Sequence, residues 1–454
     1  MDWDRLKLSF FLAIAAAGCA TILVLSSARA DRLRYLDSAI DAGKARVDSS
    51  RAGQRETLGA YFIYSKDKVA LRGLATMRLA ARQGQRAFLL VDALFVKINR
   101  PMIKHLQDEG VIVRLYHPFQ WRKPWRLFHR LHDKLWIVDG TIAITGGRNA
   151  DDAFFGWALK NYADRDAIFD GEAAADAREY FMDLWRSDHA VMPNISHVTA
   201  TAAKQAGFAL DAVEAEMYDE GLISDSDAPK DWLEGEPDIG PIEFIASRFD
   251  ANGKRQTRKV GERLGKIVIE AEEYVQIVTP YLVPSQRVMV VFQDLIRRGK
   301  KIKILTNSSE ASDGVIPVGA YLKHRDDLIR MGIELWEFQG PESLHEKSAV
   351  VDGQVGIIGT YNLDLVSAIF NSEVTIAFRN AMKAKELLDR HAERFKKAIC
   401  VGQGGQILRS KALPKGMKLR KKAAIKCSQA LTPLYHLFSE GEDLVLDGRG
   451  FPRS

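Results

Sequence analysis

Short apolar runs alternate with longer amphipathic stretches in two separate parts of the chain. This alternation predicts strands separated by helices. In the first part the predicted strands are residues 60–64, 87–91 and 111–116, and the predicted helices are residues 70–83 and 100–109. In the second part the predicted strands are residues 275–279, 303–305 and 333–338, and the predicted helices are residues 286–298 and 320–331. Each part is therefore expected to form an α/β domain with a mixed β-sheet flanked by helices.

The segments around these two parts set the expected domain boundaries. A chain of 454 residues is too long for one small core. Residues 31–55 are charged and rich in Ala, which predicts a connecting helix, and residues 201–240 have the composition of a linker. The predicted organisation is an N-terminal segment (1–30), the connecting helix (31–55), a first half (56–200), the linker (201–240), a second half (241–400) and a C-terminal extension (401–454).

The N-terminal segment indicates delivery to a membrane or across one. Arg5 and Lys7 precede an apolar stretch over residues 10–25, which is shorter than the roughly 20 residues that span a bilayer. The trio Ala28-Arg29-Ala30 fits a signal-peptidase site. A retained anchor and a cleaved signal peptide both remain open from the residues alone.

The charge of the chain is modest overall but uneven. A hydrophobic content of 46% with 27% charged residues is typical of a soluble globular body, and the net charge is +6. Residues 409–426 contain basic side chains and no acidic one. Such a run forms either a solvated face or a contact with an anionic membrane surface, at about 1 kcal/mol per basic residue. Three cysteines exclude a disulfide framework.

A pattern headed by His-x-Lys occurs once in each half, with the same spacing in both copies. The first copy consists of His132, Lys134, Asp139, Gly146 and Asn149, and the second consists of His345, Lys347, Asp352, Gly359 and Asn362. Because His, Lys and Asn are poor choices for a hydrophobic core, their recurrence at identical offsets indicates an internal repeat. The repeat also predicts an active site built from two equivalent parts.

The two Asp residues of the pattern are interpreted as structural. On a strand, each His shares a side with the Lys two residues later, while Asp133 and Glu346 face away. Asp139 and Asp352 are each followed by Gly between apolar runs, which predicts two-residue hairpin turns that return the chain to the site. Direct participation of the two Asp in chemistry remains the alternative.

Two His, two Lys and two Asn at one point suit a phosphodiester substrate. Lys134, Lys347, Asn149 and Asn362 would neutralise the non-bridging oxygens, which is the work that a metal ion does in other enzymes. One neutral imidazole would attack phosphorus, and the other would protonate the leaving alcohol and later deprotonate the acceptor. Each imidazole needs an orienting carboxylate. The candidates are Asp166 for His132, with Asp164 as a close alternative, and Glu373 for His345.

The two blocks 132–149 and 345–362 resemble the paired signature motifs of the phospholipase D superfamily. Residues 146–152, 279–284 and 305–308, together with residues 363–364, Ser367 and 371–373, are similar to bacterial cardiolipin synthases of the phospholipase D type. The resemblance covers roughly residues 58–435. It implies two pseudo-symmetric halves that share one active site, a phosphohistidine intermediate on His132, and no cofactor or metal.

Two departures from the family pattern affect the binding of the substrate. Gly147 stands where many members have Ser or Thr, so one potential phosphate-binding hydroxyl is missing, whereas Thr360 supplies it in the second half. Asp364-Leu365-Val366-Ser367 follows the second motif where such synthases often carry Pro-Arg. This removes a cation and leaves the head group of the donor or acceptor open.

The resemblance implies a phosphatidyltransferase of the bacterial inner membrane, or of the periplasm if the N-terminal segment is cleaved. Its expected substrates are phosphatidylglycerol and a second phospholipid such as phosphatidylethanolamine, its product is cardiolipin, and its expected partner is an anionic membrane surface. A phospholipase D hydrolase that uses water is the first alternative, and a phosphodiesterase acting on nucleic acid is the second. The aromatic and basic residues 121–130 fit a lipid interface, a surface loop or a nucleic-acid contact. The apolar N-terminus favours lipid, so no nucleic-acid partner is expected.

Overall fold

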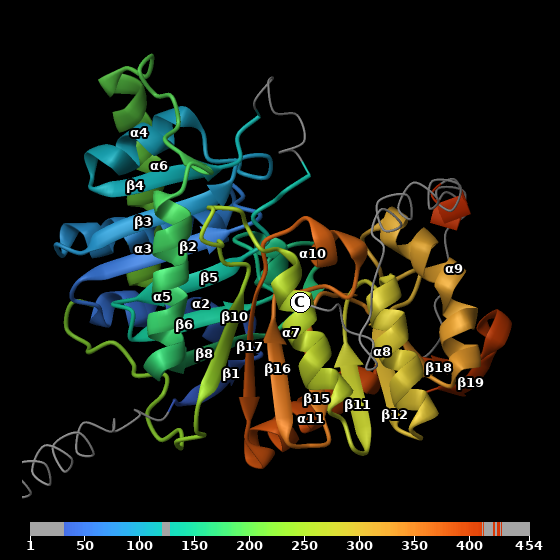
Figure 1. The fold of residues 1–454 in the computed structure, drawn as a ribbon. Coiled ribbons are helices and arrows are strands. Elements are labelled where there is room, and N and C mark those ends of the chain that lie inside the picture. Colours follow the sequence, from blue (N-terminus) through green and yellow to red (C-terminus); the bar gives the residue numbers. More distant parts are fainter. Residues whose placement is uncertain are drawn as a thin grey trace, which may run out of the picture.

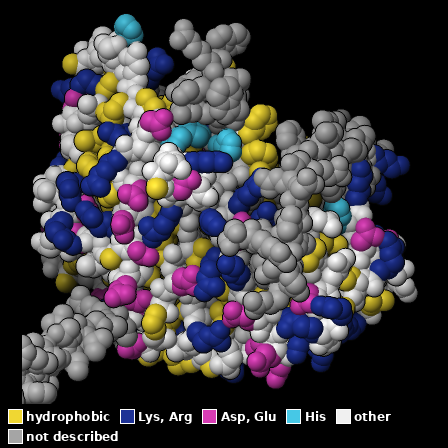
Figure 2. All heavy atoms as spheres, viewed as in Figure 1, with side chains coloured by type: hydrophobic (Ala, Val, Ile, Leu, Met, Phe, Trp, Pro, Cys, Tyr) yellow, Lys and Arg dark blue, Asp and Glu magenta, His cyan; other side chains and the backbone are white. Residues whose placement is uncertain are grey.

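The computed structural model describes residues 31–119, 128–410, 412, 421–422, 425–426 and 428. The predictions for residues 1–30, for most of the aromatic and basic stretch 121–130 and for most of the basic stretch 409–426 lie outside the described residues. Within the described part, no helix has the length and apolarity needed to cross a bilayer. On the face drawn in Figure 2, Lys and Arg side chains are interspersed with Asp and Glu.

Two mixed β-sheets organise the described chain (Figure 1). The first sheet has the strand order β1-β8-β6-β5-β2-β3-β4-β9, and the second has the order β10-β17-β16-β15-β11-β12-β13-β18-β19. The strands of the first sheet are β1 (Leu33–Leu36), β2 (Glu56–Tyr61), β3 (Arg86–Asp92), β4 (Val111–Tyr116), β5 (Lys134–Val138), β6 (Ile142–Gly146), β8 (Asp166–Asp170) and β9 (Ala190–Val191). Those of the second are β10 (Ile242–Ala246), β11 (Tyr274–Val278), β12 (Lys301–Asn307), β13 (Glu334–Phe338), β15 (Ser348–Val351), β16 (Val355–Gly359), β17 (Val374–Arg379), β18 (Ala398–Val401) and β19 (Ile407–Ser410).

The two sheets correspond strand by strand, with β19 added at the end of the second. In both, the strand after the motif His (β5, β15) pairs antiparallel with its hairpin partner (β6, β16) on one side and with β2 or β11 on the other. β2 and β11 each begin the parallel part of their sheet. The α/β prediction with two pseudo-symmetric halves is therefore confirmed.

Helices cover both faces of each sheet. The helices of the first half are α2 (Ala39–Ala52), α3 (Lys68–Arg82), α4 (Arg100–Asp108), the 3₁₀ turn η2 (Asp152–Phe154), α5 (Gly171–Arg186) and α6 (Ala200–Asp219). Those of the second are α7 (Arg258–Ile269), α8 (Gln286–Arg297), α9 (Val315–Met331), α10 (Leu365–Ile369), α11 (Ala381–Phe395) and the 3₁₀ turn η3 (Gln403–Gly405). Side chains of α5 and α11 share one hydrophobic cluster with strands of both sheets, so the two halves pack through a common core.

Local sequence signals fix the ends of several helices. Asn99 caps α4 by accepting a hydrogen bond from the backbone N–H of Met102, and Pro101 lies in the first turn, where its missing N–H costs nothing. α9 ends at Gly332, which has φ 105° and closes the helix in the left-handed conformation. These are the boundaries at which the amphipathic pattern stops.

Two segments outside the predicted halves carry more structure than expected. The predicted connecting helix is a strand, β1, followed by α2; β1 pairs with β8 because Leu33 and Tyr35 alternate toward the core. β1 occupies the position that β10 has in the second sheet, so the repeat begins earlier than residue 56. The segment predicted as a linker begins with α6, which packs against α3 and α4.

The two Asp-Gly pairs of the motifs form the predicted hairpins, but each connection is three residues long rather than two. Val138 pairs with Ile142, and Val351 pairs with Val355. Asp139 and Asp352 have φ 55° and 52° and are followed by Gly140 and Gly353, both with φ 65°. Asp is one of the few residues besides Gly that tolerates this left-handed conformation.

Each turn carboxylate also ties the hairpin to the start of a parallel strand. The Asp139 carboxylate accepts hydrogen bonds from the backbone N–H groups of Gln54, Arg55 and Glu56 at 2.8, 2.7 and 2.9 Å. The Asp352 carboxylate accepts them from Glu272, Glu273 and Tyr274 at 2.8, 2.9 and 2.8 Å. Both carboxylates lie at the end of the strand opposite to the His, where they stabilise the fold.

We expect Asp139→Asn to lower the free energy of unfolding by about 1–3 kcal/mol while the folded enzyme keeps its turnover within a few-fold. The reason is that an amide offers one oxygen and brings an NH₂ group toward three backbone donors. Chemical denaturation and turnover of the folded fraction measure the two effects, and Asp352→Asn is the matched variant in the second half. Loss of turnover at unchanged stability would assign Asp139 to the chemistry instead.

Candidate active site

The two His-x-Lys segments enter the site from opposite halves and present their side chains in the same way. His132 and His345 are each 6% exposed, and Lys134 and Lys347 are 0% and 4% exposed. Because side chains alternate along a strand, Asp133 and Glu346, which stand between each His and its Lys, face the other side of the sheet. The site groups are therefore withdrawn from bulk water before a substrate binds.

Short parallel bridges cross between the halves and place each His beside a carboxylate. Leu131 pairs with Ser372, so the next residues, His132 and Glu373, lie side by side. In the equivalent bridge, strand β14 (Ser343–Leu344) pairs with strand β7 (Tyr162–Ala163). The residues that follow these two strands are His345 and Asp164, and the backbone N–H of His345 donates to the carbonyl of Ala163 at 2.9 Å.

Glu373 contacts His132 rather than the histidine of its own half. Its Oε2 lies 3.0 Å from Nδ1 of His132. The Ser367 hydroxyl donates to Oε1 at 2.6 Å, and the Thr360 hydroxyl donates to Oε2. The hydroxyl of Thr360, expected from the resemblance to bind phosphate, is thus engaged by the carboxylate.

Asp164 has the corresponding position in the other half. Its Oδ2 lies 2.7 Å from Nδ1 of His345, and its Oδ1 accepts from the backbone N–H of Arg165 at 2.8 Å. A Cβ atom on Gly147 would lie 2.1 Å from Oδ1 of Asp164. The missing hydroxyl at Gly147 is therefore explained by the carboxylate, which occupies the space that a larger side chain would need.

Asp166, the first sequence candidate for orienting His132, lies away from both imidazoles. Its Oδ2 accepts from the buried guanidinium of Arg46 at 2.8 Å, and its Oδ1 accepts from the backbone N–H of Arg148 at 3.3 Å. Asp164, the alternative candidate in the sequence, is the carboxylate that contacts an imidazole, and that imidazole is His345 rather than His132. The sheet register carries the missed signal: Gly146 pairs with Asp166 and Gly359 with Thr375. Asp164 and Glu373 each stand two residues before the residue that pairs with the motif Gly, so they are equivalent in the two sheets.

The two lysines donate to the backbone of their own motifs. Nζ of Lys134 donates to the His132 carbonyl at 2.6 Å, and Nζ of Lys347 donates to the His345 carbonyl and lies 3.2 Å from Nε2 of that ring. Burial lowers the pKa of Lys134 to about 7 and that of Lys347 to about 8, although neighbouring carboxylates oppose the shift. Among the described residues, no carboxylate is bound directly to either ammonium, which leaves its charge for an anionic ligand.

The two asparagines of the repeat differ in their surroundings. The side-chain oxygen of Asn149 accepts from the backbone N–H of Ile63 at 3.1 Å, which turns the amide NH₂ away from the Ile63 backbone. The side-chain oxygen of Asn362 is buried and makes no hydrogen bond within the described residues. Both side chains lie at the ends of the return strands, where the prediction put them.

The residues that face away from the site hold the two halves together. The Tyr180 hydroxyl donates to Asp133 Oδ2 at 2.8 Å, and Arg255 of the second half lies 3.9 Å from the same oxygen. Glu346 pairs with Arg165 of the first half and with Arg394 at 3.1 Å. The sequence shows these acids at equal offsets in the repeat but gives no indication of their crossed partners.

The two histidines differ in their electrostatic environment. Burial, followed by Lys134, Lys347 and His345, holds the pKa of His132 well below its ordinary value. Burial alone would raise the pKa of Asp164, but His345 and Lys347 lower it below its ordinary range. Burial raises the pKa of Glu373 well above its ordinary value, against the effect of Lys134. Burial and Lys347 also hold the pKa of His345 below its ordinary value, but Asp164 opposes this shift. Both histidines are thus biased toward the neutral form, and His345 has the ionised partner that stabilises an imidazolium.

Together these groups can hold an anionic tetrahedral centre between two imidazoles. Each imidazole contacts a carboxylate at Nδ1, so Nε2 is the atom available for attack or proton transfer. At His345 this atom also lies beside Nζ of Lys347. The two ammonium groups supply the charge that such a centre requires. The chemistry open to this arrangement is nucleophilic substitution at phosphorus.

Two parts of the chain match one known family, and related proteins match over most of the chain. Residues 50–185 and 266–399 each match the family described as "Cardiolipin synthase, PLD-like domain". A protein of Helicobacter pylori strain J99, itself uncharacterised, is 27% identical over 402 residues, which cover 79% of each chain. Cardiolipin synthase C of Escherichia coli K12 is 26% identical over 409 residues, covering 78% of this chain and 82% of that one. The crystal structure of phosphatidylserine synthase from Haemophilus influenzae superposes with a TM-score of 0.64 at 14% identity, over 90% of this chain and 95% of that one, and has the same fold.

Proposed function

The chain belongs to the cardiolipin synthase family of phospholipase D-like proteins, and on this premise we propose that it makes cardiolipin from phosphatidylglycerol and a second phospholipid. The observation that carries the proposal is the pair of buried imidazoles, each oriented by a carboxylate from the opposite half, with a lysine beside each. A relative named cardiolipin synthase that matches over most of both chains supports the choice of substrate.

In the first step of the proposed reaction, Nε2 of His132 attacks phosphorus of the donor lipid. The bond from phosphorus to the leaving oxygen breaks, and His345 gives its proton to that oxygen. The low pKa of His132 supports its role as the neutral nucleophile, and the ionised partner of His345 supports its role as the acid.

In the second step, His345 removes the proton from a glycerol hydroxyl of phosphatidylglycerol. The hydroxyl oxygen attacks phosphorus, and the bond from phosphorus to Nε2 of His132 breaks. Lys134 and Lys347 stabilise the negative charge of the non-bridging oxygens in both steps. We propose that residues 1–30 hold the enzyme at the bacterial inner membrane, where both lipids reside.

Mass spectrometry of the lipids formed by the purified full-length protein tests this function. The protein is incubated with phosphatidylglycerol, with and without phosphatidylethanolamine, and a His132→Ala variant is run in parallel. Cardiolipin formed only by the wild type supports the transferase and identifies the donor. Phosphatidic acid without cardiolipin would mean a hydrolase, and unchanged lipids would direct attention to nucleic-acid substrates.

The lowered pKa values of the two lysines predict an alkaline limit to catalysis. As the pH rises through about 7 to 8, Lys134 and Lys347 lose their protons in the free enzyme, so its affinity for the phosphate falls. We expect kcat/KM to decrease by about tenfold per pH unit or more above this range. kcat should decrease less, because a bound phosphate keeps the ammonium groups protonated.

Profiles of both parameters between about pH 6 and pH 9 measure this effect. Lys134→Arg, which keeps its charge throughout, should move the onset of the alkaline limb from about pH 7 to about pH 8, where Lys347 still titrates. A kcat/KM that stays flat to the alkaline end would show that the lysine charges do not control substrate binding.

A further inference from the structure

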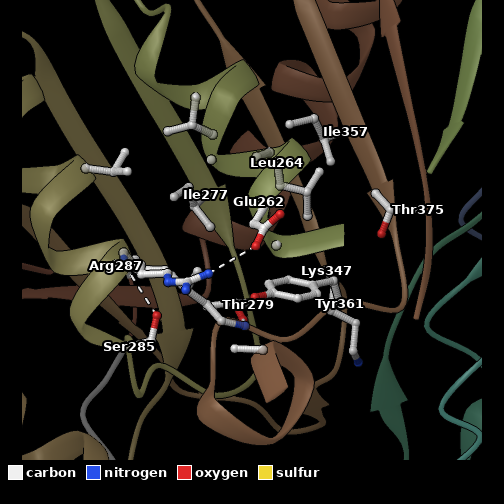
Figure 3. Close-up of a pocket in the computed structure, with 18 of the residues that line it drawn as sticks. Glu262, Leu264, Ile277, Thr279, Ser285, Arg287, Lys347, Ile357, Tyr361 and Thr375 are labelled. Atoms are coloured by element: carbon white, nitrogen blue, oxygen red, sulfur yellow. Dashed lines mark hydrogen bonds and ion pairs between the residues drawn. The ribbon is translucent and has the colours of Figure 1, made fainter. Parts of the chain in front are cut away.

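An apolar cavity of about 190 Å³ lies in the second half, between α7, α8 and α10 on one side and the sheet on the other (Figure 3). Its wall is formed mainly by Leu264, Val268, Ile277, Val291, Phe292 and Ile357. Leu264 and Val268 face this space from α7 and are only partly buried. Helix and sheet therefore leave an opening where a closely packed interface would be expected.

The cavity extends to the active site. Lys347 is part of its wall, together with Gly359 and Thr375, which frame the motif of the second half. In Figure 3, Arg287 and Ser285 lie on one side of the cavity and Lys347 and Thr375 lie on the other. Arg287 pairs with Glu262 at 3.1 Å where α7 and α8 meet. A ligand whose phosphate lies on Lys347 would therefore find hydrocarbon surface directly beside it.

The internal repeat shows why the second half has this space. Trp136 and Ala349 both stand four residues after a motif His. The Trp136 indole is 2% exposed and donates to the Ser50 hydroxyl of α2 at 3.0 Å, so it occupies part of the space between sheet and helix. Ala349 is too small to do the same, and the cavity lies beside it.

The first half also has a cavity at the corresponding place, but its wall differs in chemistry. It includes Trp136, Tyr61 and the buried Arg46, whose guanidinium pairs with Asp166. Of the repeated His, Lys and Asn residues, its wall includes Asn149. Lys134 is not part of this wall, so the first cavity, unlike the one at Lys347, does not adjoin the lysine that would hold the phosphate.

A lipid substrate needs such a space because the reacting phosphorus is attached to its glycerol close to the acyl chains. The histidines that must reach the phosphorus are 6% exposed. The glycerol and the first methylene groups must therefore enter the protein with the phosphate. Apolar cavities of about 150 Å³ stay free of water and bind small hydrocarbons, so this cavity can hold part of a chain.

We propose that the cavity between α7, α8 and the second sheet binds one acyl chain of the phospholipid whose phosphate lies on Lys347. The inference rests on the proposed function and extends it, because it makes the length of the acyl chain a determinant of turnover. An acyl chain bound in the cavity would also favour diacyl phospholipids over water-soluble phosphodiesters that present the same phosphate to the same lysines.

Filling the cavity tests the proposal. In Ala349→Leu and Ala349→Trp the new side chain enters the space, and the indole at the equivalent position of the first half shows that this fold accommodates Trp there. The measured quantity is kcat/KM for phosphatidylglycerol with 16-carbon chains relative to that with 2-carbon chains, which are too short to enter the cavity, both in mixed micelles. We expect this ratio to fall by about tenfold or more, with turnover of the short-chain lipid retained.

Two further variants distinguish the effect of filling the cavity from a general loss of activity or stability. Leu264→Trp fills it from the opposite wall, on α7, and should lower the same ratio. Ala377→Leu adds the same bulk as Ala349→Leu on the same row of the sheet, in register with Ile357 but outside the cavity, and should leave the ratio unchanged. A ratio that stays at the wild-type value in folded Ala349→Leu and Leu264→Trp would overturn the proposal.

A second measurement does not depend on turnover. Phosphatidylglycerol with a photoactivatable diazirine in one acyl chain is cross-linked to the full-length protein, and the labelled peptides are identified by mass spectrometry. Labels on α7 and α8 are expected in the wild type, and their loss in Ala349→Trp is the matched result. Labels elsewhere would overturn the cavity assignment, whereas labels on α7 and α8 in a protein that makes no cardiolipin would contradict the proposed function alone.

Discussion

His132→Ala is expected to reduce phosphatidyl transfer by at least about 10⁴-fold, because it removes the atom to which phosphorus becomes bonded. His345→Ala is expected to cause a loss of similar size for a different reason, since the leaving oxygen then departs without a proton. The two variants should differ when the leaving group needs no proton. Phosphatidyl-p-nitrophenol has such a leaving group.

With this substrate, His345→Ala should still release p-nitrophenol in a rapid burst of about one equivalent. The enzyme then accumulates the covalent phosphatidyl adduct, because the second step lacks its base. His132→Ala should give neither burst nor adduct. Rapid mixing measures the burst, and mass spectrometry of the quenched protein locates the adduct.

His197→Ala is the matched control, because His197 is exposed and is not part of the repeat. It should behave as wild type. An adduct on His345, formed in His132→Ala and absent from His345→Ala, would exchange the roles of the two histidines.

The sequence contains enough information to predict most of the fold and the members of the site. The strands and helices follow from the apolar pattern. β4 has the predicted bounds, α8 ends one residue earlier than predicted, and α9 begins five residues earlier. The His, Lys and Asn residues follow from the repeat, because identical offsets put equivalent side chains on equivalent strands. β1 escaped prediction, since a four-residue strand next to a charged helix has too short a pattern to stand out.

Which carboxylate serves which histidine could not be predicted from offsets. Spacing along the chain relates residues within one half, whereas the bridges at Leu131 and Ser372 and at Leu344 and Ala163 run between the halves. The loops before the two carboxylates also differ in length, which hides the equivalence of Asp164 and Glu373. The crossed arrangement means that neither half can form a complete site alone.

This crossing has a kinetic signature in the variants Asp164→Asn and Glu373→Gln. Each should lower kcat for phospholipid by about 10²- to 10⁴-fold, because an amide no longer fixes the tautomer and orientation of its imidazole. With phosphatidyl-p-nitrophenol they should separate. Asp164→Asn disturbs His345 and should keep the p-nitrophenol burst, whereas Glu373→Gln disturbs the nucleophile His132 and should lose it.

Asp166→Asn distinguishes the crossed arrangement from the one inferred by spacing alone. Because Asp166 neutralises the buried Arg46, the variant should lower the free energy of unfolding by about 3 kcal/mol, while its folded fraction keeps both burst and turnover. If Asp166 oriented His132, its variant would instead lose the burst at full stability. A burst lost in Asp164→Asn and kept in Glu373→Gln would mean that each carboxylate serves the histidine of its own half, which the main-chain bridges on either side of the site do not allow.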